Sequence, residues 1–122
     1  MSGRLLLAAL LVLGLAAGCG RGTTRPDLPA SASPARGKQL IEYYGCGACH
    51  VIGGIATANG HVGPALTNFS ADRQIAGTLP NTAANVVRWI RNPQKIAPKT
   101  DMPTLGIGRQ GAQAIAAYLY GQ

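Results

Sequence analysis

Cys46-Gly47-Ala48-Cys49-His50 is the stretch that decides the fold of this chain. It has the spacing C-x-x-C-H, the attachment motif of a c-type haem. Two thiols three positions apart can each form a thioether with one vinyl group of the porphyrin, and the adjacent imidazole then lies under the iron as its proximal ligand. The motif therefore predicts one haem c, bound covalently through Cys46 and Cys49, with His50 as an iron ligand.

Three other uses of a C-x-x-C pair fit this sequence less well. A thioredoxin-like redox site needs a surrounding β-α-β pattern, whereas these flanks are rich in Gly, Ala and Gln. A zinc site needs four ligands, and His61 is the only further His or Cys downstream of His50. A structural disulfide between Cys46 and Cys49 would be strained and would leave His50 unexplained.

The first residues indicate an export signal. Residues 5–17 are an uninterrupted apolar run behind a short basic start, which is typical of a signal peptide and short for a bilayer span. The run ends in Ala16-Ala17-Gly18-Cys19, which resembles a bacterial lipobox, although Ala16 stands where Leu is usual. We therefore expect residues 1–18 to be a lipoprotein signal peptide and Cys19 to be lipidated. An ordinary cleaved signal and an uncleaved anchor are the alternatives.

A flexible tether is expected at residues 19–34, because this stretch is rich in Pro, Gly, Ser and Thr and has a single Leu. Attachment of c-type haem belongs on the outer face of the bacterial cytoplasmic membrane. The expected location is therefore periplasmic or at the outer face of a bacterial membrane, with a lipid anchor at Cys19.

The folded domain is expected at residues 35–122, as a small all-α fold of three to four helices with long loops around one haem. The chain has one Phe and one Trp, so the core of such a small domain is marginal and the haem becomes its centre of packing. We expect the apo-protein to be largely unfolded. The domain carries eight basic and three acidic residues, which favours docking to an acidic redox partner. An exported protein without interleaved aromatic residues is not expected to bind nucleic acid.

Capping and periodicity predict three helices and allow a short fourth. The first helix begins after Ser33 as N-cap, with Pro34 at its first position. The others are expected at about 81–92, where Pro93 stops the helix, at about 110–120, and, for the short one, near 70–76.

Met102 is the expected second iron ligand. It is the only Met after the signal, and it lies in a polar loop followed by Pro103. A Met more often fills a packed core, so its presence in a polar loop favours ligation of haem iron. His61 as the ligand, or an open or water-bound site, are the alternatives.

An ordered set of motifs resembles a monohaem class I cytochrome c: residues 45–50, Val62-Gly63-Pro64-Ala65-Leu66, Met102-Pro103 and residues 115–119. The middle of the domain is similar to the haem domain fused to subunit II of caa-type cytochrome c oxidases, through residues 77–82 and Trp89-Ile90-Arg91-Asn92-Pro93-Gln94.

This resemblance implies that the first and last helices cross, and that His50 and Met102 are the axial ligands. It also implies that the Pro64 carbonyl accepts a hydrogen bond from the His50 ring. Trp89 and Arg91 would pack on the haem and balance its propionates, with helix core and solvated helix face as their alternative roles. The copper-binding domain and membrane helices of an oxidase subunit have no counterpart in this sequence.

The expected function is that of a membrane-tethered carrier of single electrons in a bacterial respiratory chain, not of an enzyme. Its partners would be redox proteins, with a terminal oxidase as the suggested one. The alternative is a gas-binding or peroxidase-like haem protein with a displaceable sixth ligand.

Overall fold

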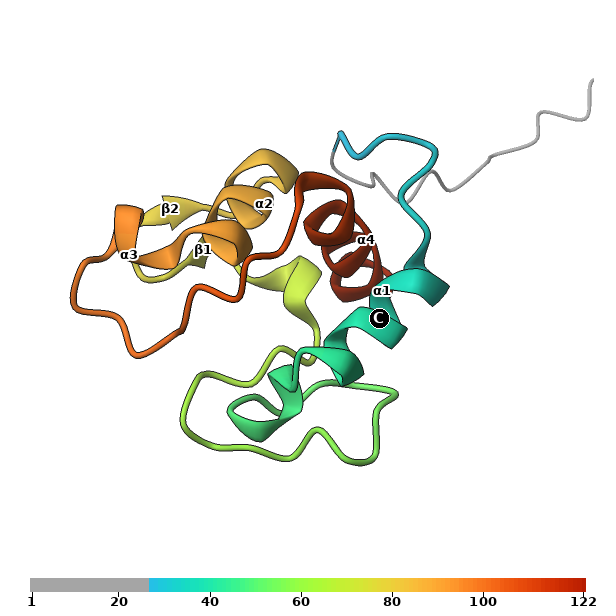
Figure 1. Ribbon diagram of the computed structural model, residues 1–122, viewed down its shortest axis with the longest axis horizontal. Coiled ribbons are helices and arrows are strands. Elements are labelled where there is room, and N and C mark those ends of the chain that lie inside the picture. Colours follow the sequence, from blue (N-terminus) through green and yellow to red (C-terminus); the bar gives the residue numbers. More distant parts are fainter. Residues whose placement is uncertain (1–26) are drawn as a thin grey trace, which may run out of the picture.

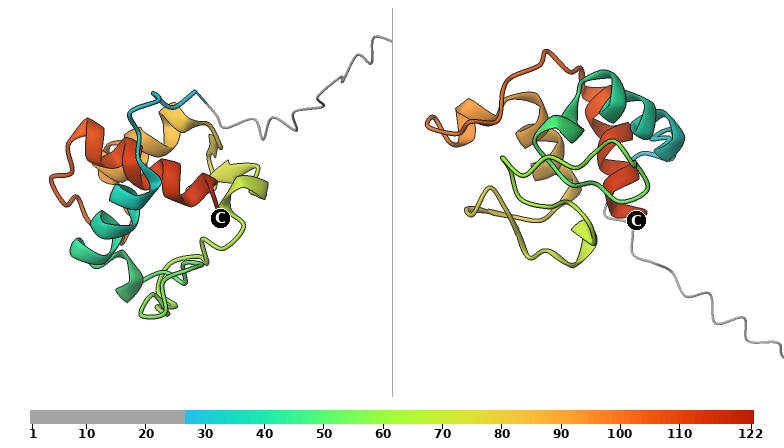
Figure 2. Two further views of the ribbon diagram at one scale, coloured as in Figure 1. Left: turned by 90° about the vertical axis from the view of Figure 1, so that its right-hand side faces the viewer. Right: turned by 90° about the horizontal axis from the view of Figure 1, so that it is seen from below.

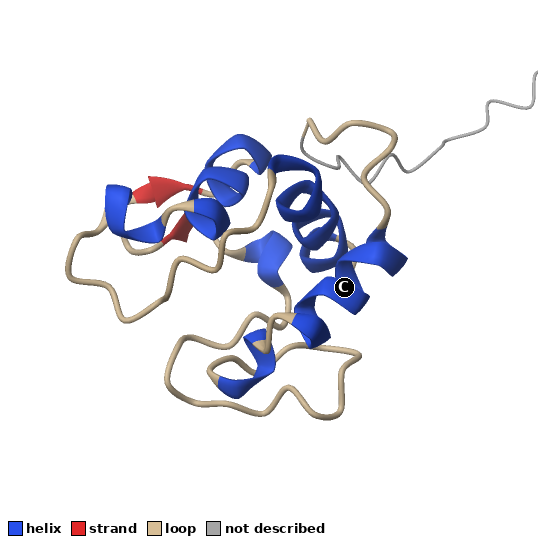
Figure 3. Cartoon of the chain, viewed as in Figure 1, coloured by secondary structure: helices blue, strands red, loops and turns tan. Residues whose placement is uncertain are grey.

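The computed structural model describes residues 27–122, so Cys19 and the predicted signal peptide lie outside the described residues. Helices dominate this part of the chain, which confirms the all-α expectation (Figures 1 and 3). None of the helices in residues 27–122 has the length and apolarity to cross a bilayer. The elements are α1 (Pro34–Tyr43), the 3-10 turns η1 (Cys46–Ala48) and η2 (Phe69–Ala71), the short strands β1 (Gln74–Ile75) and β2 (Leu79–Pro80), α2 (Ala83–Arg91), α3 (Pro93–Ile96) and α4 (Arg109–Tyr120).

Two side-chain caps fix where α1 and α2 begin. The Ser33 hydroxyl accepts a hydrogen bond from the Arg36 N–H at 3.2 Å, and the Thr82 hydroxyl accepts one from the Asn85 N–H at 3.2 Å. Such caps satisfy amide groups that have no partner within the helix, and each contributes about 1 kcal/mol. The predicted N-cap Ser33 is confirmed, and α2, expected to start at about residue 81, has Thr82 as its N-cap.

Helix α4 packs against both α1 and α2 (Figures 1 and 2). The α1–α4 contact is close enough that a β-carbon at Gly37 would overlap the backbone carbonyl of Ala114. It would also stand 3.0 Å from the Tyr118 β-carbon. The small residues Ala112, Ala114, Ala116 and Ala117 of α4 are buried, which lets its neighbours approach. The packing of the first helix against the last, implied by the resemblance, is present.

Two local expectations need correction. Pro93 ends α2 but also begins α3, because its fixed φ suits the first turn of a helix once Asn92 has left helical geometry, with φ −149° and ψ 67°. The short helix expected near 70–76 is wrong over most of its length. A 3-10 turn ends at Ala71, and the chain then forms the antiparallel pair β1–β2, whose connecting loop places Ala76 at φ 51°.

Tyrosine side chains near the end of α4 hold two loops against the helical core. The Tyr120 hydroxyl donates to Asn81 Oδ1 at 2.5 Å, and Asn81 Nδ2 donates to the carbonyls of Phe69 and Asp72 at 2.8 and 2.9 Å. Burial raises the pKa of Tyr120 to about 12. The Tyr118 hydroxyl donates to the Gly53 carbonyl at 2.7 Å.

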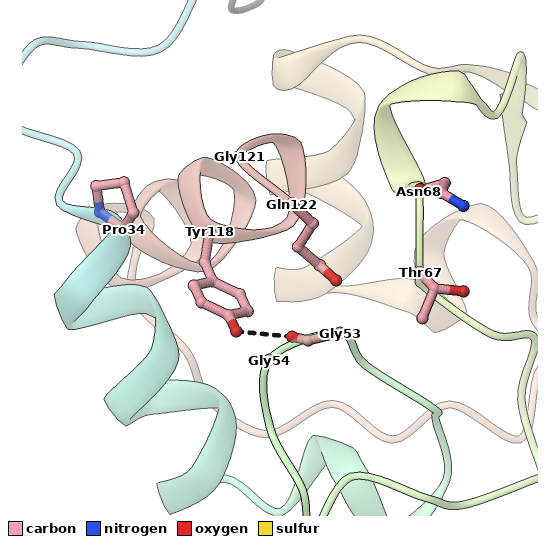
Figure 4. A pocket seen from close by; sticks show the side chains of 8 residues that line it. All are labelled: Pro34, Gly53, Gly54, Thr67, Asn68, Tyr118, Gly121 and Gln122. Atoms are coloured by element: carbon pink, nitrogen blue, oxygen red, sulfur yellow. Dashed lines mark hydrogen bonds between the residues drawn. The ribbon is translucent and has the colours of Figure 1, made fainter.

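The hydrogen bond from Tyr118 to Gly53 lies at an open hollow of about 470 Å³ between α1, the end of α4 and two loop segments (Figure 4). Neither a cysteine, a histidine nor a methionine lines this hollow, so it lies apart from the predicted haem site. Its lining residues are Pro34, Gly53, Gly54, Thr67, Asn68, Tyr118, Gly121 and Gln122.

Candidate functional site

One tight turn carries both cysteines and the histidine of the motif. Gly45 adopts a left-handed conformation, with φ 70°, directly after α1, and η1 follows at once. The N–H groups of Cys49 and His50 both donate to the Cys46 carbonyl, at 3.2 and 3.1 Å. The turn therefore sets the spacing of the three side chains through the backbone. Both thiols are half-buried and free of any disulfide.

The Cys46 thiol lacks the lowered pKa of a redox-active cysteine. Burial raises the pKa of the Cys46 thiol, an effect that a backbone hydrogen bond partly offsets and the neighbouring Cys49 reinforces. A thioredoxin-like nucleophile depends on a lowered pKa instead. Within residues 27–122, no three His, Cys, Asp or Glu side chains gather closely enough to hold a metal ion.

The His50 ring is oriented by Pro64. Its Nδ1 atom lies 2.7 Å from the Pro64 carbonyl oxygen, so Nδ1–H donates to that oxygen. In the neutral ring this bond places the proton on Nδ1, so Nε2 is the nitrogen available to an iron atom. The structure thus contains the hydrogen bond that the resemblance implied, while the role of Pro64 at a bound haem stays a prediction.

Backbone hydrogen bonds hold the loop that follows His50 against the turn at residues 46–49. The Gly60 N–H donates to the Gly47 carbonyl at 3.0 Å, and the Gly63 N–H donates to the Cys49 carbonyl at 2.8 Å. Gly63 lies so close to the imidazole that a β-carbon there would stand 2.8 Å from His50 Nδ1. The loop therefore braces the turn, and its glycine makes room for the ring.

Met102 lies on a different segment, between α3 and α4, and is half-buried. Among the described residues no hydrogen bond joins this segment to the His50 loop. Instead, the Gln94 side chain holds the Met102 carbonyl through a bond of 2.6 Å from Nε2. Sequence reasoning did not identify Gln94 as functional, because the bond spans eight residues and has no periodic signal.

The remaining candidates divide. Trp89 is half-buried on α2 and packs against the core. Arg91 is half-buried, and its buried Nε has no hydrogen-bond partner among the described residues. A buried donor without an acceptor is costly, and a haem propionate would supply the acceptor. His61 is exposed on its loop.

The residues present fit a covalent haem. The donor set consists of two free thiols, one imidazole held in the required tautomer, and one thioether on a braced loop. The unpartnered Arg91 Nε suits an anionic group at the edge of the same cofactor. When bound, haem c supplies the one-electron exchange between ferrous and ferric iron, and the protein supplies ligation and burial.

Comparison with known proteins gives a family and one relative. The family model for cytochrome c matches residues 34–121. The chain is 37% identical over 92 residues to cytochrome c oxidase subunit 2 of Alkalihalophilus pseudofirmus. The aligned region covers 75% of this chain and 26% of the relative, so the chain spans about a quarter of that protein's length. No solved structure matches the chain.

Proposed function

The chain belongs to the cytochrome c family, whose members are electron carriers and not enzymes, and on that premise we propose that it is a tethered monohaem carrier with His50 and Met102 as axial ligands. The observation that carries this proposal is the hydrogen bond of 2.7 Å from His50 Nδ1 to the Pro64 carbonyl. In the neutral ring this bond keeps the proton on Nδ1, so Nε2 is free to bind a metal. His50 directly follows the turn that holds both cysteines.

With both axial positions filled by protein, the iron offers no position to a substrate, and the haem serves electron transfer alone. A Met sulfur favours the ferrous state and raises the reduction potential relative to two imidazoles. The support for Met102 is its half-buried position on a loop whose backbone is held by Gln94 and Thr100.

A terminal oxidase is the proposed partner. The support is the similarity to cytochrome c oxidase subunit 2, a relative of which this chain spans about a quarter. The excess of basic residues, 11 Lys and Arg against 4 Asp and Glu in the whole chain, suits docking to an acidic surface. In this proposal the carrier passes electrons to or from the oxidase.

Lipidation of Cys19 and export are the second half of the proposal, and they rest on the sequence of the first 19 residues. A lipid on Cys19 would hold the carrier at a membrane while residues 20–34 let it reach its partners. Cys19→Ser tests this directly. The variant should move from the membrane fraction to the soluble exported fraction and keep its haem. Retention in the membrane fraction would contradict a lipid anchor at Cys19.

The ligand set is tested by absorption spectra of the purified holoprotein, oxidised and reduced, with and without carbon monoxide. A ferric charge-transfer band from the Met–iron bond, together with no change on adding carbon monoxide, is the expected result. In Met102→Ala the band should vanish and carbon monoxide should bind. Ready binding to the unmodified protein would favour the gas-binding or peroxidase-like alternative.

A further inference from the structure

Gln94 uses both ends of its side-chain amide on the segment that carries Met102. Its Nε2 donates to the Met102 carbonyl at 2.6 Å. Its Oε1 accepts a hydrogen bond from the Thr104 hydroxyl. Gln94 therefore contacts this segment twice, at Met102 itself and at Thr104, two positions later. The bond to the Met102 carbonyl is partly buried, so solvent competes less for it than at an exposed site, whereas the bond from Thr104 is exposed.

The base of this brace is rigid. Gln94 follows Pro93, which is among the most completely buried side chains of the molecule. The Met102 N–H donates to the hydroxyl of Thr100, two residues earlier, at 3.2 Å. The Thr100 N–H in turn donates to the Ala97 carbonyl at 3.0 Å. Both backbone polar groups of Met102 are thus held by partners within eight residues along the chain.

Apolar packing does little for this segment. Between α3 and α4, Ile107 is the buried hydrophobic residue, five positions beyond Met102. Asp101, Pro103 and Leu105 are exposed. The position of Met102 therefore depends on hydrogen bonds, and the Gln94 amide makes two of them.

We propose that Gln94 is a positioning residue that keeps the Met102 sulfur on the sixth coordination position and so sets how easily an external ligand displaces it. This inference rests on the proposed axial role of Met102. An external ligand binds only molecules in which the Met–iron bond is open, so its apparent affinity is proportional to the open fraction. A brace that favours the closed loop lowers that fraction.

Gln94→Glu is the sharpest test, because the variant keeps side-chain length and still accepts from Thr104, yet it cannot donate to the Met102 carbonyl. The measurement is imidazole binding to the ferric holoprotein, followed as loss of the Met–iron charge-transfer band. We expect the apparent affinity for imidazole to rise about tenfold, the size expected for losing one partly buried hydrogen bond. Unchanged affinity would overturn the proposal.

Thr104→Val gives an independent arm at an exposed position, in case the Glu variant does not fold. It removes the hydroxyl that holds Gln94 Oε1, and we expect an increase in imidazole affinity of about threefold. Thr104→Ser retains the hydroxyl and should restore the original affinity. If valine and serine behave alike, the brace is not what holds the ligand.

Ser33→Ala is the matched stability control. It removes the N-cap of α1, far along the chain from Met102, and should lower the unfolding free energy by about as much as one lost hydrogen bond. Its imidazole affinity should stay unchanged, and an equal rise would assign the effect to global stability and refute the proposal. The unmodified protein separates the two ideas, since a missing charge-transfer band there contradicts Met102 ligation itself.

Discussion

Gly63 lies against the face of the His50 imidazole, and a β-carbon at residue 63 would stand 2.8 Å from Nδ1 and 3.0 Å from Nε2. These distances are shorter than any ordinary carbon contact, so the ring or the loop must move if a side chain is added. Gly63→Ala should therefore tilt His50 away from its hydrogen bond with Pro64. We expect a loss of about 1–3 kcal/mol in unfolding free energy, measured by denaturant titration of the holoprotein, with a weakened Met–iron charge-transfer band.

The control for this substitution is Gly108→Ala. A β-carbon at Gly108 meets nothing within 4 Å, so any cost there reflects the backbone at the start of α4 rather than the haem site. The charge-transfer band of this variant should be unchanged. Equal spectral effects of both substitutions would show that the contact with His50 is not responsible.

Arg91 should tune the reduction potential. Its buried Nε lacks a partner among the described residues, which favours a position beside a haem propionate. Removal of the positive charge in Arg91→Gln disfavours the ferrous state, which holds one more electron. We expect the potential to fall by tens of millivolts, because a charge interaction of about 1 kcal/mol corresponds to roughly 40 mV for one electron.

Arg88→Gln is the matched control on the same helix. Arg88 is exposed, and its guanidinium bonds to the Asn85 side chain. Its removal should change the potential much less, and the comparison is made by spectroelectrochemical titration of the two variants. Shifts of equal size would contradict a specific contact between Arg91 and a haem propionate.

How much the sequence predicts depends on whether the signal is local. Ser33 and Thr82 mark the starts of α1 and α2 because a cap acts within three residues. The hairpin of β1 and β2 was missed because its loop places Ala76 at φ 51°, a conformation that alanine seldom adopts. The preceding residue, Ile75, is buried in the core, a tertiary contact that no local pattern reports.

The site shows the same division. The C-x-x-C-H motif contains both thiols and the imidazole that attach a haem, so the haem is predictable from five residues. Pro64 followed from a family resemblance, and the structure supplies its bond to His50. The role of Gln94 could not be predicted, because a glutamine on a four-residue helix has no sequence pattern that shows which way its amide points. Contacts of this kind require coordinates.

Tyr120 should make stability depend on alkaline pH. Burial raises its pKa from the ordinary value of 10.0 to about 12. The unfolded state therefore ionises first, and the stabilisation is complete below about pH 10 and is lost as the pH rises to about 12. Unfolding of the reduced holoprotein between pH 9 and 12 should show this loss, and Tyr120→Phe should flatten it. Tyr43→Phe, at a ring that is 80% exposed, should leave the profile as it is.

The haem should be required for cooperative folding. Helices α1, α2 and α4 pack through small and aliphatic side chains, and Phe69 is the only phenylalanine in the core. The two segments proposed to bring His50 and Met102 to the iron share no hydrogen bond within the described part of the chain, so a covalent haem would connect them. Cys46→Ala combined with Cys49→Ala should therefore abolish cooperative loss of helical circular dichroism on heating. Met102→Ala, which retains both thioethers, should still melt cooperatively. Cooperative melting of the double variant with native helix content would mean that the three helices form a sufficient core by themselves.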